Sequence, residues 1–170
     1  IDHAGTPDAD EFTWEMEYDT EGHLVVMKRS ESDGEITNIT YKDGDVVKTS
    51  TRYVASGDLN GDGIIDSNDE WEYSAAIDYT TDNITAPIEN KGCLMLFDEI
   101  LDVDMDEMIY AYYGGMLGKA TKHLPLVGHC TYNGEDSVSD MYFTWTLNSD
   151  SYPTELVVKD QWDEYRCTSV

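Results

Sequence analysis

The sequence predicts a mainly β fold, an antiparallel meander that forms a curved sheet or open barrel, with one short α-helix near residues 104–113. Three observations predict this class. Apolar and polar residues alternate with a period of two in several segments. Asp-Gly turns separate those segments, leaving no room for the crossovers that a parallel sheet needs. Aromatic residues are also frequent, with 12 Tyr and 4 Trp that must pack somewhere.

The elements follow one another from the N-terminus. Residues 1–10, rich in Asp, Gly and Pro, are expected to be a flexible arm. From Phe12 to Tyr18 every second residue is apolar, and a turn at 19–22 follows. Further strands are predicted at 24–29, 36–41 and 46–54, separated by Asp-Gly turns at 33–34 and 43–44.

The chain also matches itself at a fixed offset. Residues 12–14 and 143–145 both read Phe-Thr-Trp, Asp19 aligns with Asp150, and residues 25–28 align with 156–159. The match predicts the same strand-turn-strand unit near both ends, with the turn carried by Gly22 in one copy and Pro153 in the other.

One segment has helical character. Asp102, Asp104 and Asp106 precede an apolar stripe, which is typical of a helix N-terminus and predicts a helix over residues 104–113. Gly114-Gly115 ends it, and residues 116–126 form a connector.

Residues 58–69 match the calcium-loop pattern, in which positions 1, 3, 5, 9 and 12 offer side-chain oxygens and position 7 offers a carbonyl. The predicted ligands are Asp58, Asn60, Asp62, Ile64, Asp66 and Asp69. Gly63 permits the sharp turn, and Ile65 is expected to point to the core and pin the loop. The alternative is an acidic turn that binds no ion. Residues 11–170 are therefore predicted to form a single calcium-binding β domain.

The loop resembles that of dockerin modules, which also begin Gly-Asp-x-Asn-Gly-Asp-Gly and carry Asp at the last position, here Asp69. Dockerins have two such loops, each followed by a helix. Residues 71–79 instead alternate with strand period, so we expect the loop to lie within a β-hairpin. The second Asp-rich run has Glu107 where the pattern needs Gly.

Charge restricts the partners. The 36 acidic and 10 basic residues give a net charge of −26, which repels nucleic acid and anionic membrane surfaces. No apolar run approaches the roughly 18 residues that span a bilayer, so the folded domain is expected to make no membrane contact itself. The charge keeps an exported protein soluble or, alternatively, attracts cations or basic partners.

No catalytic residue is predicted. His123, His129 and Cys130 could supply zinc ligands or a Cys-His nucleophile, but no motif fixes a further partner, so packed histidines and a buried thiol are favoured. The numerous carboxylates carry no glycosidase signal. Cys93, Cys130 and Cys167 allow either one disulfide and one thiol or three thiols.

The hairpin unit, together with residues 89–96 and 112–121, resembles an uncharacterised family of exported envelope proteins of Bacteroides-type bacteria. The resemblance implies a curved antiparallel sheet, either a lipid anchor or secretion, and a location in the periplasm, on the outer surface or outside the cell. It brings no activity. In that location external calcium would fill even a weak loop.

The leading hypothesis is a non-catalytic envelope protein, stabilised by calcium, that binds an unknown glycan or protein through its sheet. Trp71, Trp162 or some of the tyrosines would form a platform on which a sugar stacks. One alternative is a calcium-dependent hydrolase with carboxylates converging near Asp66 or Glu70. The other is a dockerin-like assembly module. The sequence does not indicate an oligomeric state.

Overall fold

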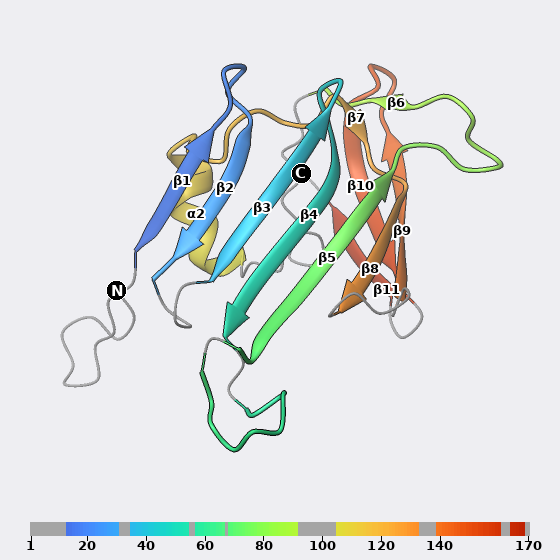
Figure 1. Cartoon of the computed structure of the whole chain (residues 1–170). Coiled ribbons are helices and arrows are strands. Elements are labelled where there is room, and N and C mark those ends of the chain that lie inside the picture. The colour runs from blue at the N-terminus through green and yellow to red at the C-terminus, as the bar shows by residue number, and fades with distance from the viewer. Residues whose placement is uncertain are drawn as a thin grey trace.

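The computed structural model describes residues 13–30, 35–54, 57–66, 68–91, 105–132, 139–160 and 164–168. Within these residues nine strands form one antiparallel sheet in the order β1-β2-β3-β4-β5-β8-β9-β10-β11 (Figure 1). The strands are β1 (Trp14–Tyr18), β2 (Leu24–Arg29), β3 (Ile36–Lys42), β4 (Asp45–Val54), β5 (Glu70–Asp78), β8 (Val127–Tyr132), β9 (Ser139–Leu147), β10 (Pro153–Lys159) and β11 (Glu164–Thr168). The described residues also form a helix, α2 (Met105–Tyr113), and a separate pair of strands, β6 (Ile88–Glu89) and β7 (His123–Leu124).

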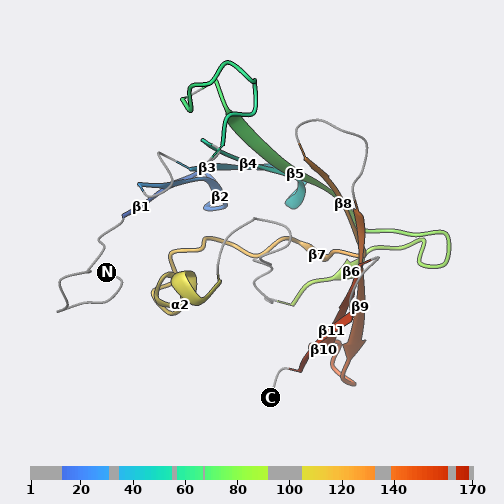
Figure 2. The ribbon, with the colours of Figure 1, turned by 90° about the horizontal axis from the view of Figure 1, so that it is seen from below.

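The sheet is strongly curved and is not closed. Figure 2 shows β1–β5 as one wall and β9–β11 as the other, with β8 at the bend and α2 and β7 on the concave side. In the described part of the chain β1 pairs only with β2, and β11 pairs only with β10. The predicted curved antiparallel sheet with one short helix is therefore confirmed.

The hydrophobic core lies on the concave face. Alternation in β5 buries Tyr73, Ala75 and Ile77 and turns the residues between them outward, as the period of two requires. Met108 of α2 and Leu117 of the connector are almost fully buried in the same cluster. Most strands contribute to it through Leu24, Met27, Ile39, Tyr73, Ala75, Ile77, Cys130, Met141, Phe143, Leu156 and Val158.

The predicted strand and helix boundaries agree closely with the structure. The β3–β4 turn has positive φ at both Asp43 (55°) and Gly44 (89°), the backbone of a type I′ hairpin. The arm at residues 1–10 and the turn at 33–34 lie outside the described residues. The β6–β7 pair was not predicted, because two-residue strands give no periodic signal. No described helix is long and apolar enough to cross a membrane.

The repeated hairpin is present, but its predicted turn alignment is wrong. In the first turn Asp19 Oδ1 accepts hydrogen bonds from the amides two and four residues later, and Gly22 has φ 89°. In the second turn Asn148 Oδ1 accepts the equivalent pair, and Ser151 has φ 65°. Pro153 instead begins β10, since a residue without an amide hydrogen suits the first position of a strand.

Candidate functional site

The 58–69 loop joins β4 to β5 and extends beyond the end of the sheet (Figure 1). Val54 and Glu70 pair at its base, which confirms the predicted placement within a β-hairpin. Strand β5 begins directly after Asp69, where a dockerin would have a helix. The chain therefore lacks the helix that follows a dockerin loop at this point.

Asp69, the last residue of the pattern, is the anchor of the loop. Its side chain is fully buried, and Oδ1 accepts hydrogen bonds from the amides of Leu59 (2.7 Å) and Asn60 (3.1 Å). Oδ2 accepts from the Asp66 amide at 3.0 Å. The Asp66 and Asn60 amides hold the pKa of the Asp69 carboxyl below its usual range, because they stabilise the charged form. Asp69 thus closes the loop as an anion.

Asp58, the first residue, organises the other side of the loop. Its Oδ1 accepts from the amides of Gly61 (2.6 Å) and Asp62 (3.2 Å), and its Oδ2 accepts from Gly63 at 2.8 Å. Gly63 has φ 85°, as its predicted role in the turn requires. The side chain of Asn60 accepts from the Asp62 amide at 2.9 Å. The first half of the loop is therefore wrapped around the Asp58 carboxylate.

Two expectations for the loop differ from the structure or stay untested. Ile65 is 57% exposed rather than buried, because the loop extends past the sheet and there is no core for this side chain to reach. In the described part of the chain no three His, Cys, Asp or Glu side chains are grouped so as to hold a metal ion. The carboxylates of Asp58 and Asp69 contact backbone amides instead, so calcium binding stays a prediction.

The histidines and the cysteine do not assemble into the catalytic cluster considered above. Cys130 is a buried free thiol and accepts a hydrogen bond from the Tyr73 hydroxyl. His129, its neighbour in β8, lies on the opposite face, with Nδ1 2.7 Å from Asp140 and Nε2 3.2 Å from Asp78. The Asp140 carboxylate raises the pKa of His129 by accepting that bond.

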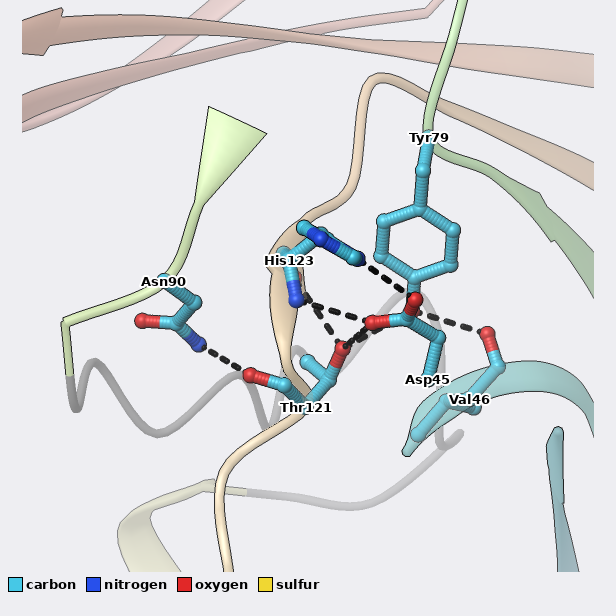
Figure 3. Close-up of polar contacts among 6 residues, drawn as sticks. All are labelled: Asp45, Val46, Tyr79, Asn90, Thr121 and His123. Carbon is cyan, nitrogen blue, oxygen red and sulfur yellow. Dashed lines mark hydrogen bonds and ion pairs between the residues drawn. The ribbon is translucent and has the colours of Figure 1, made fainter. Parts of the chain in front are cut away.

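His123 belongs to a polar network that fixes the connector to the sheet (Figure 3). Its Nδ1 lies 2.7 Å from Asp45 Oδ2, and its amide donates to Asp45 Oδ1 at 2.8 Å. The Thr121 hydroxyl, which is buried, lies 3.0 Å from the same Oδ1. One carboxylate at the start of β4 therefore holds two residues of the connector.

Tyr79 and Asn90 complete this network (Figure 3). The Tyr79 hydroxyl donates to the Val46 carbonyl at 2.8 Å and lies 3.1 Å from the Thr121 hydroxyl. Burial raises the pKa of Tyr79, so it stays a hydrogen-bond donor. The Asn90 side-chain amide donates to the Thr121 carbonyl at 2.8 Å. The side chains in this network are satisfied by one another and by the backbone, so its role is to position the connector.

An open hollow of about 530 Å³ lies next to this network. It is formed by the β1–β2 turn, the β3–β4 turn and the connector, at the end of the sheet opposite the 58–69 loop. Its lining consists of Asp19, Glu21, His23, Tyr41, Asp43, Gly44, Lys119, Ala120 and Lys122. Neither Asp66 nor Glu70 lines it, so the carboxylates of the hydrolase hypothesis are not in this hollow.

His23 is the most buried side chain that lines the hollow. It is 6% exposed, its Nδ1 lies 2.9 Å from Asp19 Oδ2, and its ring stacks on Tyr41 with centroids 4.5 Å apart. Burial and the Asp19 charge raise the pKa of Tyr41 to about 12. The sequence analysis missed this site because its three segments are far apart in the chain. The pair Lys119 and Lys122, in so acidic a sequence, was the available signal.

The predicted sugar platform is only partly described. Trp71 lies on the concave face beside Tyr132, with ring centroids 5.8 Å apart, and Tyr132 is 37% exposed. Trp162 lies outside the described residues. The aromatic pair thus sits near the base of the 58–69 loop.

Comparison with known proteins places the fold. The family described as a domain of unknown function (DUF4595) with porin-like fold matches residues 5–155. The crystal structure of a porin-like protein from Bacteroides vulgatus ATCC 8482 superposes with a TM-score of 0.63 at 15% identity over 93% of this chain. The chain spans 65% of the length of that protein. This likeness is one of fold.

A second porin-like protein, from Bacteroides uniformis ATCC 8492, matches with a TM-score of 0.36 and 16% identity, over 92% of this chain and 76% of the other. No curated protein matches the chain.

Proposed function

Because the chain belongs to the family of domains of unknown function (DUF4595) with a porin-like fold, we propose that it is a non-catalytic protein of the bacterial envelope that a calcium ion stabilises. In this proposal the chain is exported, carries a lipid anchor in its full-length form, and binds a glycan or protein partner. The envelope setting is supported by the resemblance of the sequence to exported envelope proteins of Bacteroides-type bacteria.

The chemistry of the 58–69 loop supports calcium as its ion. The donors on offer are carboxylate, amide and carbonyl oxygens, which calcium prefers over nitrogen or sulfur. The proposed ligands are Asp58, Asn60, Asp62, Ile64, Asp66 and Asp69. An ion there would neutralise carboxylates that repel one another across a short loop. A lone loop at the end of a sheet fits a stabilising role better than a signalling role.

One observation carries the proposal: the loop is closed around both ends of the pattern. The carboxylate of the first residue, Asp58, accepts hydrogen bonds from three backbone amides. The carboxylate of the last residue, Asp69, is fully buried and accepts hydrogen bonds from three more. Those hydrogen bonds hold the loop closed, with both ends of the calcium pattern in place. The Gly63 amide donates to Asp58 Oδ2, so the residue before Ile64 lies beside Asp58.

The test is thermal unfolding in excess calcium and in chelator. With a Kd of about 1 mM and about 10 mM calcium, binding stabilises the fold by about 1.4 kcal/mol, which raises Tm by about 3–5 °C. Asp62→Ala should abolish that rise, because it removes a proposed ligand at an exposed position outside the core. Asp82→Ala, an exposed acidic position in another loop, is the matched control and should keep it. A calcium response that survives Asp62→Ala would contradict the site.

The other two functions receive less support. The hollow and the acidic loop lie at opposite ends of the sheet, so calcium at the loop would not act on a substrate in the hollow. An assembly role of the dockerin type needs a helix after Asp69, and β5 occupies that place.

A further inference from the structure

We propose that the hollow between the two hairpin turns and the connector binds a saccharide unit that carries a carboxylate, such as a uronic acid. This proposal rests on the glycan-binding role proposed above. It places that binding in the hollow and names the class of saccharide that binds there. A hollow of about 530 Å³ has the size of small-molecule sites in proteins.

The first argument is that the hollow holds unused hydrogen-bonding capacity of both kinds. Four of its side-chain atoms have no partner in the described part of the chain: His23 Nε2, Tyr41 Oη, and the Nζ atoms of Lys119 and Lys122. His23 Nδ1 lies 2.9 Å from Asp19 Oδ2, and in the tautomer that carries its only ring proton on Nδ1 the Nε2 atom is an acceptor. Tyr41 and the lysines are donors. A hydroxyl-rich ligand uses acceptors and donors together.

The second argument is the distribution of charge. The acidic residues come from the two hairpin turns, whereas Lys119 and Lys122 come from the connector. Asp19 is engaged by His23 and by turn amides, which leaves the carboxylates of Glu21 and Asp43 in the turns beside the lysine-bearing connector. A carboxylate fits the lysine wall, and hydroxyl groups fit the acidic wall. A multiply charged anion such as phosphate is disfavoured by the field of a chain with net charge −26.

The third argument is that both walls are already in place. The Lys119 amide donates to the Gly22 carbonyl at 3.0 Å, and the Lys122 amide donates to the Gly44 carbonyl at 2.9 Å. His23 is held by its bond to Asp19 and its stacking on Tyr41. A site whose walls are fixed before binding avoids the cost of ordering them.

The experiment is an NMR titration of the ¹⁵N-labelled chain in excess calcium with galacturonic acid, galactose, glycine and inorganic phosphate. Galacturonic acid should shift the amides of residues 21–23, 41–44 and 119–122 and bind about tenfold more tightly than galactose, because each charge-assisted bond contributes that much. Preference for glycine or phosphate, or equal binding of galactose, would overturn the ligand class.

Two sets of variants locate the site. The double variant Lys119→Gln, Lys122→Gln should lose at least about tenfold in affinity for galacturonic acid. The double variant Lys48→Gln, Lys159→Gln removes the same charge from exposed strand positions and should bind normally. Tyr41→Phe should weaken binding by a few-fold through the loss of one hydroxyl.

Thermal unfolding with and without calcium is measured on the same samples. If galacturonic acid does not bind to a chain that calcium still stabilises, the saccharide site in the hollow is overturned and the calcium site is not. Tight binding in a chain that calcium does not stabilise overturns the calcium site and leaves the hollow standing. Equal loss of affinity in both double variants overturns the assignment to Lys119 and Lys122.

Discussion

Asp19 and Asn148 hold equivalent places in two hairpin turns but have different side chains. Each uses Oδ1 to accept the amides two and four residues later, at 2.8 and 2.9 Å for Asp19 and at 2.9 and 3.0 Å for Asn148. The turn therefore requires an oxygen and not a charge. The second carboxylate oxygen of Asp19, which Asn148 lacks, contacts His23: Oδ2 lies 2.9 Å from His23 Nδ1.

This difference predicts a change in acid stability. The amide and imidazole of His23 lower the pKa of Asp19 from 3.8 to about 2. The charged form is thus favoured in the folded state, and its stabilisation is present above pH about 4 and lost as the pH falls through about 2. Asp19→Asn should fold at neutral pH and show a shallower loss of stability below pH about 4. Urea midpoints measured from pH 7 downward check this.

Asn148→Asp is the reciprocal control for that prediction. Its carboxylate would accept the same two turn amides, so acid sensitivity should increase in this variant. Identical pH profiles for the wild type and Asp19→Asn would show that the Asp19 charge does not stabilise the fold.

At the scale of elements, the connector after α2 is fitted closely to the sheet. The Tyr18 hydroxyl donates to the Met116 carbonyl. A Cβ added at Gly118 would lie 2.8 Å from the Leu24 amide nitrogen and 3.0 Å from the Gly22 carbonyl oxygen. Both neighbours are backbone atoms that cannot move aside. Only glycine allows the connector to approach β2 this closely.

Gly118→Ala should therefore destabilise the protein by about 2–3 kcal/mol, from left-handed backbone strain and the steric contact together. Gly115→Ala is a matched control, since its φ of 68° is close to the 72° of Gly118 and its Cβ would meet no atom within 4 Å. That variant should lose only about 1 kcal/mol. Denaturant unfolding of the two variants gives the difference in stability. Equal losses of stability would mean that the connector backbone shifts to make room for the added methyl group.

The elements that the sequence predicted are those with local signals. Strand alternation, Asp-Gly turns and the acidic start of α2 are each contained within a few residues, so the strands from β1 to β5 and the helix were predicted nearly to their ends. The pattern of the 58–69 loop is contiguous as well. His23 lies on no predicted core face, and its burial depends on Tyr41, which only the β2–β3–β4 pairing brings close.

Long-range placement explains the remaining differences. The hollow combines residues near 20, 42 and 120, and no local pattern relates such segments. Ile65 was expected in the core because the calcium pattern favours an apolar residue there. Its exposure follows from the length of the hairpin beyond the sheet, which periodicity does not report.

At the scale of the whole molecule, the charge of −26 opposes the compact state. Salt from about 10 to about 150 mM shortens the Debye length from about 30 to about 8 Å, so it weakens that repulsion. In chelator, Tm should rise over this range, and the further rise on adding calcium should shrink. The variant Lys48→Gln, Lys159→Gln, which is more negative, should depend more steeply on salt. A Tm that falls with salt would contradict this reasoning.

The long segment of chain between β5 and β8 contains a place where the protein could be split into two pieces. Residues 82–87 in this segment are exposed, and a break there would leave β1–β5 in one piece and α2 with β8–β11 in the other. The pieces would rejoin through the β5–β8 ladder and the connector. The hollow draws its acidic wall from the first piece and its lysines from the second. A split form of this protein would therefore recover the proposed saccharide site only on reassembly, and ligand binding would report fragment complementation.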